Sequence, residues 1–263
     1  MYGVAFLMVL FPYLLWRGTW FGKPLTDGEI EKALQDGSRP RKIQHALVQI
    51  AERISRGETS SVRRWYPEVE RLSTTSPPEV RAMATWLMGQ DNQFESFHQR
   101  LADLVQDPDL LVRRNAALAL VRFGDSRGKP ELVAMLRAHK LTAPQDGLLS
   151  FRLKDGEAVT PGTLIAQIQI ASEGNVDIRS PLPGFFSNPQ AGGKRPVASS
   201  ETVGLISPAE SQVWEALRAL FLVGQTEELA DVEPYAGDLP QMSERVRQQA
   251  LQTVGAIRGR GSR

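Results

Sequence analysis

The chain has 263 residues, which exceeds the usual size of one domain and predicts at least two structural units. Its 31 Lys and Arg residues are balanced by 30 Asp and Glu residues, so it lacks the overall positive field that non-specific nucleic-acid binding requires, and we expect no nucleic-acid partner. The absence of cysteine excludes disulfides, thiolate metal sites and thiol chemistry, but it indicates no cellular compartment.

The first predicted element is a membrane anchor at residues 1–22. Residues 2–16 carry no charge and are rich in Leu, Val, Phe and Met. If Arg17 snorkels and the apolar run continues to Phe21, the helix reaches about 30 Å, the thickness of a hydrocarbon core. The basic start and the small-residue cleavage site of a signal peptide are both missing. We therefore expect residues 2–21 to contact the lipid bilayer, either spanning it or embedded in it.

The basic residues near this anchor lie on its C-terminal side, in a polar stretch that we assign as a linker at residues 23–39. The positive-inside rule then favours the cytoplasmic face of a bacterial inner membrane for the bulk of the chain. One short anchor leaves the periplasmic face open as the alternative.

Residues 40–142 show helical periodicity that repeats. The segment beginning at Ser76 overlays the segment beginning at Pro108, so that Val80 falls on Val112 and Ala84 on Ala116, at an offset of 32 residues. An earlier, degenerate copy begins at Pro40, with one apolar face made by Ile43, Ala46, Leu47, Ile50 and Ala51 and a second helix near residues 61–72. Repeats of this length predict an α-solenoid of stacked helix pairs.

These residues resemble the HEAT-repeat family, most clearly in DPDLLVRRNAALALVRFGD at residues 107–125. The resemblance implies that Asp107, Arg113 and Asp125 are structural residues of an intra-repeat ladder. It implies an architecture but no particular chemistry.

Residues 143–206 lose the helical period and show the alternation of short apolar runs with Gly, Pro and Asp that is typical of strands and turns. The segment is doubled: APQDGLL at residues 143–149 matches SPLPGFF at residues 180–186, and Val159 matches Val197. We expect a small sandwich in which each copy contributes one layer.

This segment resembles the biotinyl/lipoyl-like barrel-sandwich hybrid, which also occurs in membrane-fusion adaptor proteins. Carrier members hold a modifiable lysine at the tip of the hairpin that joins the two halves, and Glu173 occupies that position here. Because a carboxylate cannot form the amide to biotin or lipoate, and because Lys154 and Lys194 lie in other turns, we expect no cofactor on this chain.

Helices are predicted to resume at residues 207–257, starting with Ser207 as N-cap and Pro208 at the first helical position. Val246 and Ala250 repeat the pattern of Val112 and Ala116. The remaining residues, 258–263, form a basic tail that should be flexible on its own.

No motif for phosphate binding, metal-assisted hydrolysis or nucleophilic catalysis occurs, so we assign no catalytic, cofactor-binding or metal-binding residue and expect no enzymatic activity. The three histidines, His45, His98 and His139, lack metal-ligand spacing. The cluster Arg63, Arg64, Trp65 and Tyr66 could bind an anionic headgroup or an acidic partner, but a helix with a solvated basic face explains it as well.

The sequence thus predicts an α+β protein with an N-terminal membrane helix and a HEAT-like α-solenoid interrupted by a small all-β barrel-sandwich hybrid. We expect a non-enzymatic assembly subunit that binds other subunits of a large bacterial membrane complex. Chains of this kind resemble those that accompany photosynthetic reaction-centre and light-harvesting assemblies, with a respiratory complex as the second choice. A membrane-fusion-type transport adaptor and a HEAT-like lyase are the alternatives.

Overall fold

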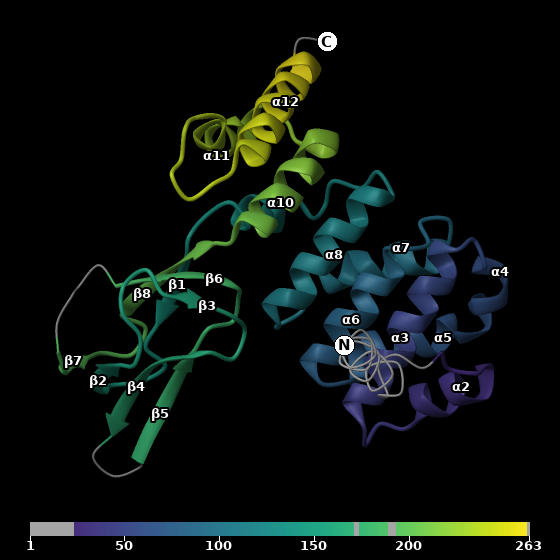
Figure 1. Cartoon of the computed structure of the whole chain (residues 1–263), viewed down its shortest axis with the longest axis horizontal. Helices are drawn as coiled ribbons and strands as arrows, with labels where there is room; N and C mark the ends of the chain where they lie inside the picture. Colours follow the sequence, from purple (N-terminus) through teal and green to yellow (C-terminus); the bar gives the residue numbers. More distant parts are fainter. Residues whose placement is uncertain (1–23, 171–173, 189–192, 262–263) are drawn as a thin grey trace, which may run out of the picture. The chain divides into compact units, whose positions relative to one another are not determined.

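The computed structural model describes residues 24–170, 174–188 and 193–261. The chain divides after Arg100 into two compact units, and Figure 1 labels the helices and strands of both. The predicted anchor at residues 1–22 and the predicted hairpin residue Glu173 lie outside the described residues, so both assignments stay predictions. Within the described residues, no helix combines the length and the apolar character needed to cross a membrane.

The first unit is helical. Its elements are α2 (Asp27–Gln35), α3 (Pro40–Ser55), α4 (Thr59–Val62), η2 (Arg63–Trp65), α5 (Tyr66–Thr75), α6 (Pro78–Met88) and the first part of α7 (Glu95–Leu104). The residues predicted as a linker, 23–39, therefore contain a helix. A capping box starts it: the Thr26 hydroxyl accepts from the main-chain N–H of Glu29, and the Glu29 carboxylate accepts from that of Thr26.

The predicted apolar face of α3 is confirmed. All five of its predicted core residues are buried, and α3 packs against α2 and α6. Helix α2 adds Ile30, Ala33 and Leu34 to the same core. Residues expected to form one helix near 61–72 instead make the short α4, one turn of 3-10 helix and α5, because Pro67 fits only at the start of a helix.

The offset of 32 residues is visible in the contacts of the two repeats. Val80 and Val112 are both fully buried, as are Ala84 and Ala116. In the first unit the Arg81 guanidinium donates to the carbonyl of Ser76 at 3.0 Å, and in the second the Arg113 guanidinium donates to the carbonyl of Pro108, the matching position, at 3.1 Å. The arginine of each repeat therefore ties the first turn of its helix to the residues that precede it.

The second unit holds five helices among its described residues, interrupted by the strands. They are α8 (Leu110–Arg122), α9 (Lys129–Ala134), α10 (Glu210–Val223), α11 (Leu229–Val232) and α12 (Glu244–Gly261). The 3-10 turn η3 (Thr226–Glu228) lies between α10 and α11, and η4 (Glu233–Ala236) lies between α11 and α12. Buried residues of all five helices share one apolar core. The helices after the insertion thus continue the packing of those before it.

The helix after the strands begins at Glu210 rather than at Ser207. The main chains of Ser207 and Pro208 pair with β6, so they cannot also serve as the first residues of a helix. The predicted apolar face of α10 is buried except for Phe221, which is exposed.

The predicted tail is helical as far as Gly261, because α12 extends through it. The Arg260 guanidinium donates to the carbonyl oxygens of Leu220, Phe221 and Gly224 at the end of α10, where the last carbonyl groups of a helix lack successive N–H partners. Arg258 forms an ion pair with Glu233 at 2.8 Å.

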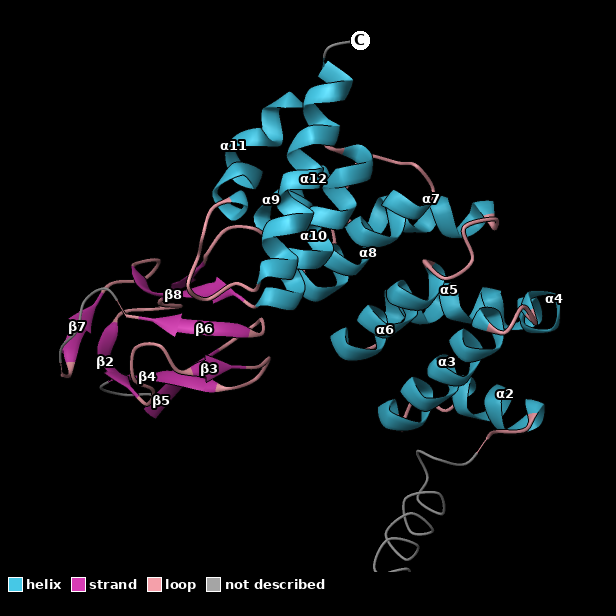
Figure 2. Cartoon of the chain, turned by 45° about the horizontal axis from the view of Figure 1, so that its top comes forward, coloured by secondary structure: helices cyan, strands magenta, loops and turns pink. Residues whose placement is uncertain are grey.

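The strands form a β-domain with its own apolar core (Figure 2). They are β1 (His139–Thr142), β2 (Gly147–Phe151), β3 (Ala158–Val159), β4 (Leu164–Ile170), β5 (Gly174–Arg179), β6 (Gly184–Ser187), β7 (Arg195–Val197) and β8 (Thr202–Pro208). Sheet A has the order β1-β8-β6-β3 and sheet B the order β5-β4-β2-β7, and every pairing is antiparallel. The domain starts at His139, a few residues before the predicted boundary at 143, because β1 pairs with β8.

The prediction that each copy forms one layer is wrong. Each sheet contains two strands of each copy. Replacing every strand of sheet A by its equivalent in the other copy (β1 by β5, β8 by β4, β6 by β2 and β3 by β7) gives the strand order of sheet B. The copies therefore interlock, related by an approximate twofold axis that exchanges the sheets. Interlocking lets each copy bury its apolar side against both sheets, so that neither copy is a layer by itself.

Candidate functional site

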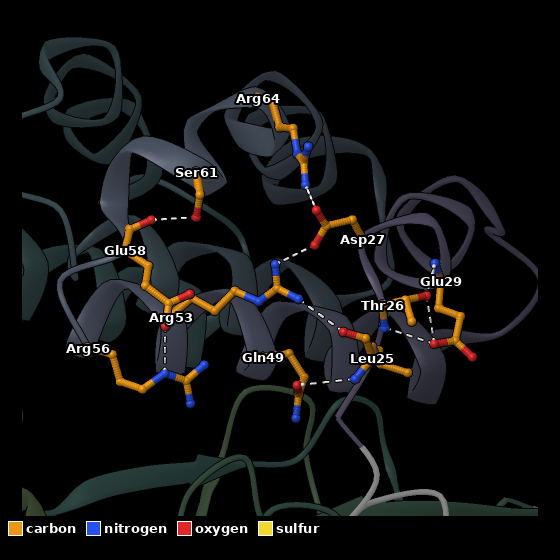
Figure 3. A network of polar contacts seen from close by, with 10 residues as sticks. All are labelled: Leu25, Thr26, Asp27, Glu29, Gln49, Arg53, Arg56, Glu58, Ser61 and Arg64. Atoms are coloured by element: carbon orange, nitrogen blue, oxygen red, sulfur yellow. Dashed lines mark hydrogen bonds and ion pairs between the residues drawn. The ribbon is translucent and has the colours of Figure 1, made fainter.

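A network of polar contacts lies where the described chain begins (Figure 3). We call it the root network, and its central residues are Leu25, Asp27, Gln49, Arg53 and Arg64. Leu25 is held there by α3 through both of its main-chain polar groups. Its N–H donates to Oε1 of Gln49 at 3.4 Å, and its carbonyl accepts from Nη2 of Arg53 at 3.0 Å. Gln49 and Arg53 are four residues apart, so they lie on one face of α3.

Asp27 lies between two arginines in Figure 3. Its Oδ1 accepts from Nη1 of Arg53 at 2.6 Å, and its Oδ2 accepts from Arg64. These hydrogen bonds, first that of Arg53 and then that of Arg64, lower the pKa of Asp27 below the ordinary value of an aspartate. The carboxylate also stands in the first turn of α2, where the helix dipole favours a negative charge. One acid thus joins α2, α3 and η2.

Trp65 packs against the two arginines of this network. Its ring is 5% exposed, and the guanidinium carbons of Arg64 and Arg53 lie 4.4 and 5.4 Å from the ring centroid, within cation–π range. The ring that could have stacked on an external ligand is therefore covered by the arginines of its own unit.

A second acid, Asp91, organises the other half of the cluster. Its buried carboxylate accepts from the Tyr66 hydroxyl at 3.0 Å and from Nη2 of Arg63 at 3.4 Å. Burial, followed by the hydrogen bond and the negative charge of Asp91, raises the pKa of the Tyr66 phenol. The Tyr66 ring packs at 4.9 and 4.4 Å, between centroids, on Phe94 and Phe97.

The structure thus changes the interpretation of the cluster predicted at residues 63–66. Trp65 and Tyr66 belong to the core, and both arginines have acidic partners within the first unit. Their side chains remain about half exposed, at 48% for Arg63 and 52% for Arg64, so each still presents a guanidinium edge to solvent. One part of this network could have been predicted from the sequence: the pattern Thr-x-x-Glu at Thr26 is typical of a capping box, which places Asp27 in the first turn of a helix.

The residues predicted to form a HEAT ladder make local contacts. Arg113 donates to the carbonyl of Asp107 at 2.8 Å and to the Glu131 carboxylate at 2.9 Å, and Asp125 binds Arg127. Asp107 itself accepts from the N–H of Asp109. These contacts lie within one helix pair, which is where the HEAT resemblance places them.

The three histidines belong to three different elements, α3, α7 and β1. His45 is buried, His98 lies 3.5 Å from Glu95, and burial lowers the pKa of His139, with Arg114 adding to the effect. Over the described residues, no three His, Asp or Glu side chains gather into a group that could hold a metal ion.

The two lysines weighed as modification sites both lie in turns of the β-domain. Lys154 follows β2, and Lys194 directly precedes β7. Neither belongs to the β4–β5 hairpin, where a carrier domain would hold its lysine.

Comparison with known protein families gives one match, to HEAT repeats, over residues 69–142. The matched segment runs from α5 to the end of β1 and includes the Val-Arg-x-x-Ala pattern at Val80 and at Val112, but not its third copy at Val246. The chain therefore contains a HEAT-repeat region. The comparison with curated proteins finds no match.

Proposed function

We propose that this chain is a non-enzymatic assembly subunit of a large bacterial membrane complex. The observation that carries the proposal is the HEAT-repeat region at residues 69–142. Helix pairs of this kind add surface without requiring a new core for each addition, which suits a protein that holds others together. A photosynthetic reaction centre with its light-harvesting rings is the first candidate complex, and a respiratory complex is the second.

The root network supports the proposal by its position. Residues 1–22 serve in this proposal as the membrane anchor, and Leu25, two residues after Lys23, is bound to α3 through both main-chain polar groups. A flexible linker would let the helices move freely about the anchor. A fixed root instead holds the first unit at a defined position next to the membrane subunits that it binds.

Deletion of residues 1–21 tests the anchor. We expect the shortened chain to fold, because the described helices carry their own cores, and to leave the membrane fraction. Tight membrane association of the shortened chain at high salt would show that the anchor lies elsewhere.

A second variant tests the fixed root. Inserting a flexible Gly/Ser segment of about ten residues after Pro24 leaves the anchor and the helices intact and separates only their coupling. We expect the variant to reach the membrane but to recover fewer co-purifying subunits in mild detergent. The matched control carries the same insertion in the exposed turn at Gly237 of the second unit. Equal recovery of subunits by both variants would refute the coupling.

We further propose that the β-domain is a biotinyl/lipoyl-like barrel-sandwich hybrid that has become a docking module. The approximate twofold relation of its sheets supports the fold, and Glu173 in place of the acceptor lysine argues against carrier chemistry. The intact mass of the native chain should equal that of the bare sequence. An added biotin or lipoate mass on Lys154 or Lys194 would overturn the docking assignment.

Replacing His139–Pro208 by a short Gly/Ser linker tests the docking role. The helices should stay folded, because they form a core separate from that of the β-domain, while assembly of the complex should weaken. The transport-adaptor alternative needs a long helical hairpin between the two halves of the sandwich. Here β4 ends at Ile170 and β5 begins at Gly174, which leaves no room for one.

A further inference from the structure

The outward face of sheet B carries a shallow hollow of about 190 Å³. Its lining is mainly polar and consists of Leu148, Ser150, Arg152, Gln167, Gln169, Asn175 and Lys194. These residues come from four strands or their ends, so the hollow lies across the sheet.

The strand register explains why these side chains gather. Gln169 of β4 is opposite Asn175 of β5 on one side and Leu148 of β2 on the other, and Gln167 is opposite Ser150 in the same way. Residues opposite one another in an antiparallel sheet point to the same face, with side chains about 5 Å apart. The amide and hydroxyl groups that line the hollow are therefore held in place by the strand pairings of sheet B.

The charges on this face are unbalanced. Asp177 is paired with Arg179 at 2.7 Å and accepts from the Gln167 amide at 2.8 Å. Arg152 binds only the uncharged Oε1 of Gln167, through both Nε and Nη2. Lys194 is exposed and forms no ion pair within the described part of the chain. The charge of Arg152 acts on Asp177 from a distance, but neither Arg152 nor Lys194 forms a salt bridge within the described residues, so the positive charges of this face outnumber its one acid.

The other half of the domain shows that the fold does not require this chemistry. The twofold relation keeps the buried positions apolar, as in Leu149 with Phe186 and Val159 with Val197. The outward positions differ in part: Gln167 corresponds to Leu205, whereas Leu148 and its counterpart Phe185 are both apolar and exposed. The polar Gln167 at the centre of the hollow therefore has an apolar counterpart in sheet A, so the repeated fold does not require an amide there.

We propose that the hollow of sheet B binds an acidic, extended segment of a partner protein. The exposed cations of Arg152 and Lys194 would pair with carboxylates, and the amides of Gln167, Gln169 and Asn175 both donate and accept, as the main chain of a peptide requires. The edge strand β5 pairs only with β4 among the described strands, so its outer side offers additional main-chain groups to such a segment. This inference rests on the proposed docking role of the β-domain and names the chemistry of its partner.

Binding of a labelled peptide tests the inference with the full chain in mild detergent. The probe is a fluorescein-labelled eight-residue peptide that alternates Glu and Thr, followed by anisotropy at low salt, and the reference is the same peptide with Lys in place of Glu. We expect the acidic peptide alone to bind. The double variant Arg152→Gln/Lys194→Gln should weaken its binding about tenfold, since two exposed charge pairs are lost.

The control is Lys140→Gln, which removes an exposed lysine from strand β1 of sheet A and should change the affinity less than about twofold. Circular dichroism should show that all variants are folded. Equal binding of the acidic peptide by the double variant and the wild type would overturn the inference. The inference would also be overturned if the double variant bound the acidic peptide normally but no longer bound vesicles containing phosphatidylglycerol, because the surface would then recognise lipid.

The two proposals can fail separately. If replacing the β-domain by a linker weakens assembly but the acidic peptide does not bind, the docking role stands and the hollow is not its surface. If the linker chain assembles normally, the docking role itself is wrong, whatever the peptide does.

Discussion

Alanine at Gly184 should open the β-domain and leave the helical core of the second unit folded. Gly184 lies in β6 opposite Pro208 of β8. A Cβ added there would lie 2.7 Å from Cγ2 of Ile206 and closer still to the main-chain oxygen of Ser207. The main chain of β8 would have to move away, because neither contact ends on a flexible side chain.

The expected cost is about 3 kcal/mol. Overpacking of a filled core typically costs about 1 to 3 kcal/mol, and an obstructed main-chain atom places this site at the upper end. A cost of that size shifts the opening equilibrium of the domain on the order of 100-fold toward the open state.

Native-state hydrogen exchange followed by mass spectrometry measures this shift locally. Peptides from both sheets should exchange on the order of 100-fold faster, whereas peptides from α10 and α12 should keep their protection because their core is separate. Gly147→Ala should act in the same way, since its Cβ would lie 2.7 Å from the main-chain oxygen of Gln169, the position equivalent to Ser207. Gly193→Ala is the matched control, with no atom within 4 Å of the added Cβ. Unchanged exchange in the Gly184 variant, or equal loss in α10 and α12, would refute the reasoning.

Three further outcomes are expected. Asp91→Asn should lower the free energy of unfolding in urea by about 2 kcal/mol, because a buried acceptor of the Tyr66 and Arg63 hydrogen bonds loses its charge, whereas the exposed Asp238→Asn should change it little. The pKa of the Tyr66 phenol is raised in the folded state, so the unfolded chain releases that proton first as the pH rises above about 10. The free energy of unfolding should therefore fall above that pH, and the urea midpoint should fall with it. The Tyr66→Phe variant should show a smaller decrease of the urea midpoint with pH. Arg260→Gln should expose the end of α10 and speed exchange in its last turn about tenfold, and unchanged exchange would show that water caps those carbonyls equally well.

Local patterns were predictable from the sequence. The repeat offset, the buried face of α3 and the internal doubling of the β-domain all follow from periodicity over short stretches, and the structure contains each of them. Helix α2 was missed although its capping box stands in the sequence, because the surrounding polar residues suggested a linker.

Long-range pairings were not predictable. Arg64 pairs with Asp27 across 37 residues and Arg63 with Asp91 across 28, and nothing in the sequence near residues 63–66 names those partners. The interlocking of the two copies escaped prediction for the same reason. Strand periodicity shows which side of a strand is buried, but it does not choose the neighbouring strand.

The pairing of β1 with β8 has a consequence for how the chain folds. The connection between α9 and α10 contains the whole β-domain, and closing so long a loop costs conformational entropy that grows with the logarithm of its length. Once His139 and Ile206 are paired, the ends of the connection are already together and only a few residues on each side remain to be closed. An effective loop roughly tenfold shorter lowers the entropic cost of joining α9 to α10 by about 2 kcal/mol. A β-domain that folds early would thus speed the completion of the helical core, even though the two cores share no buried residue.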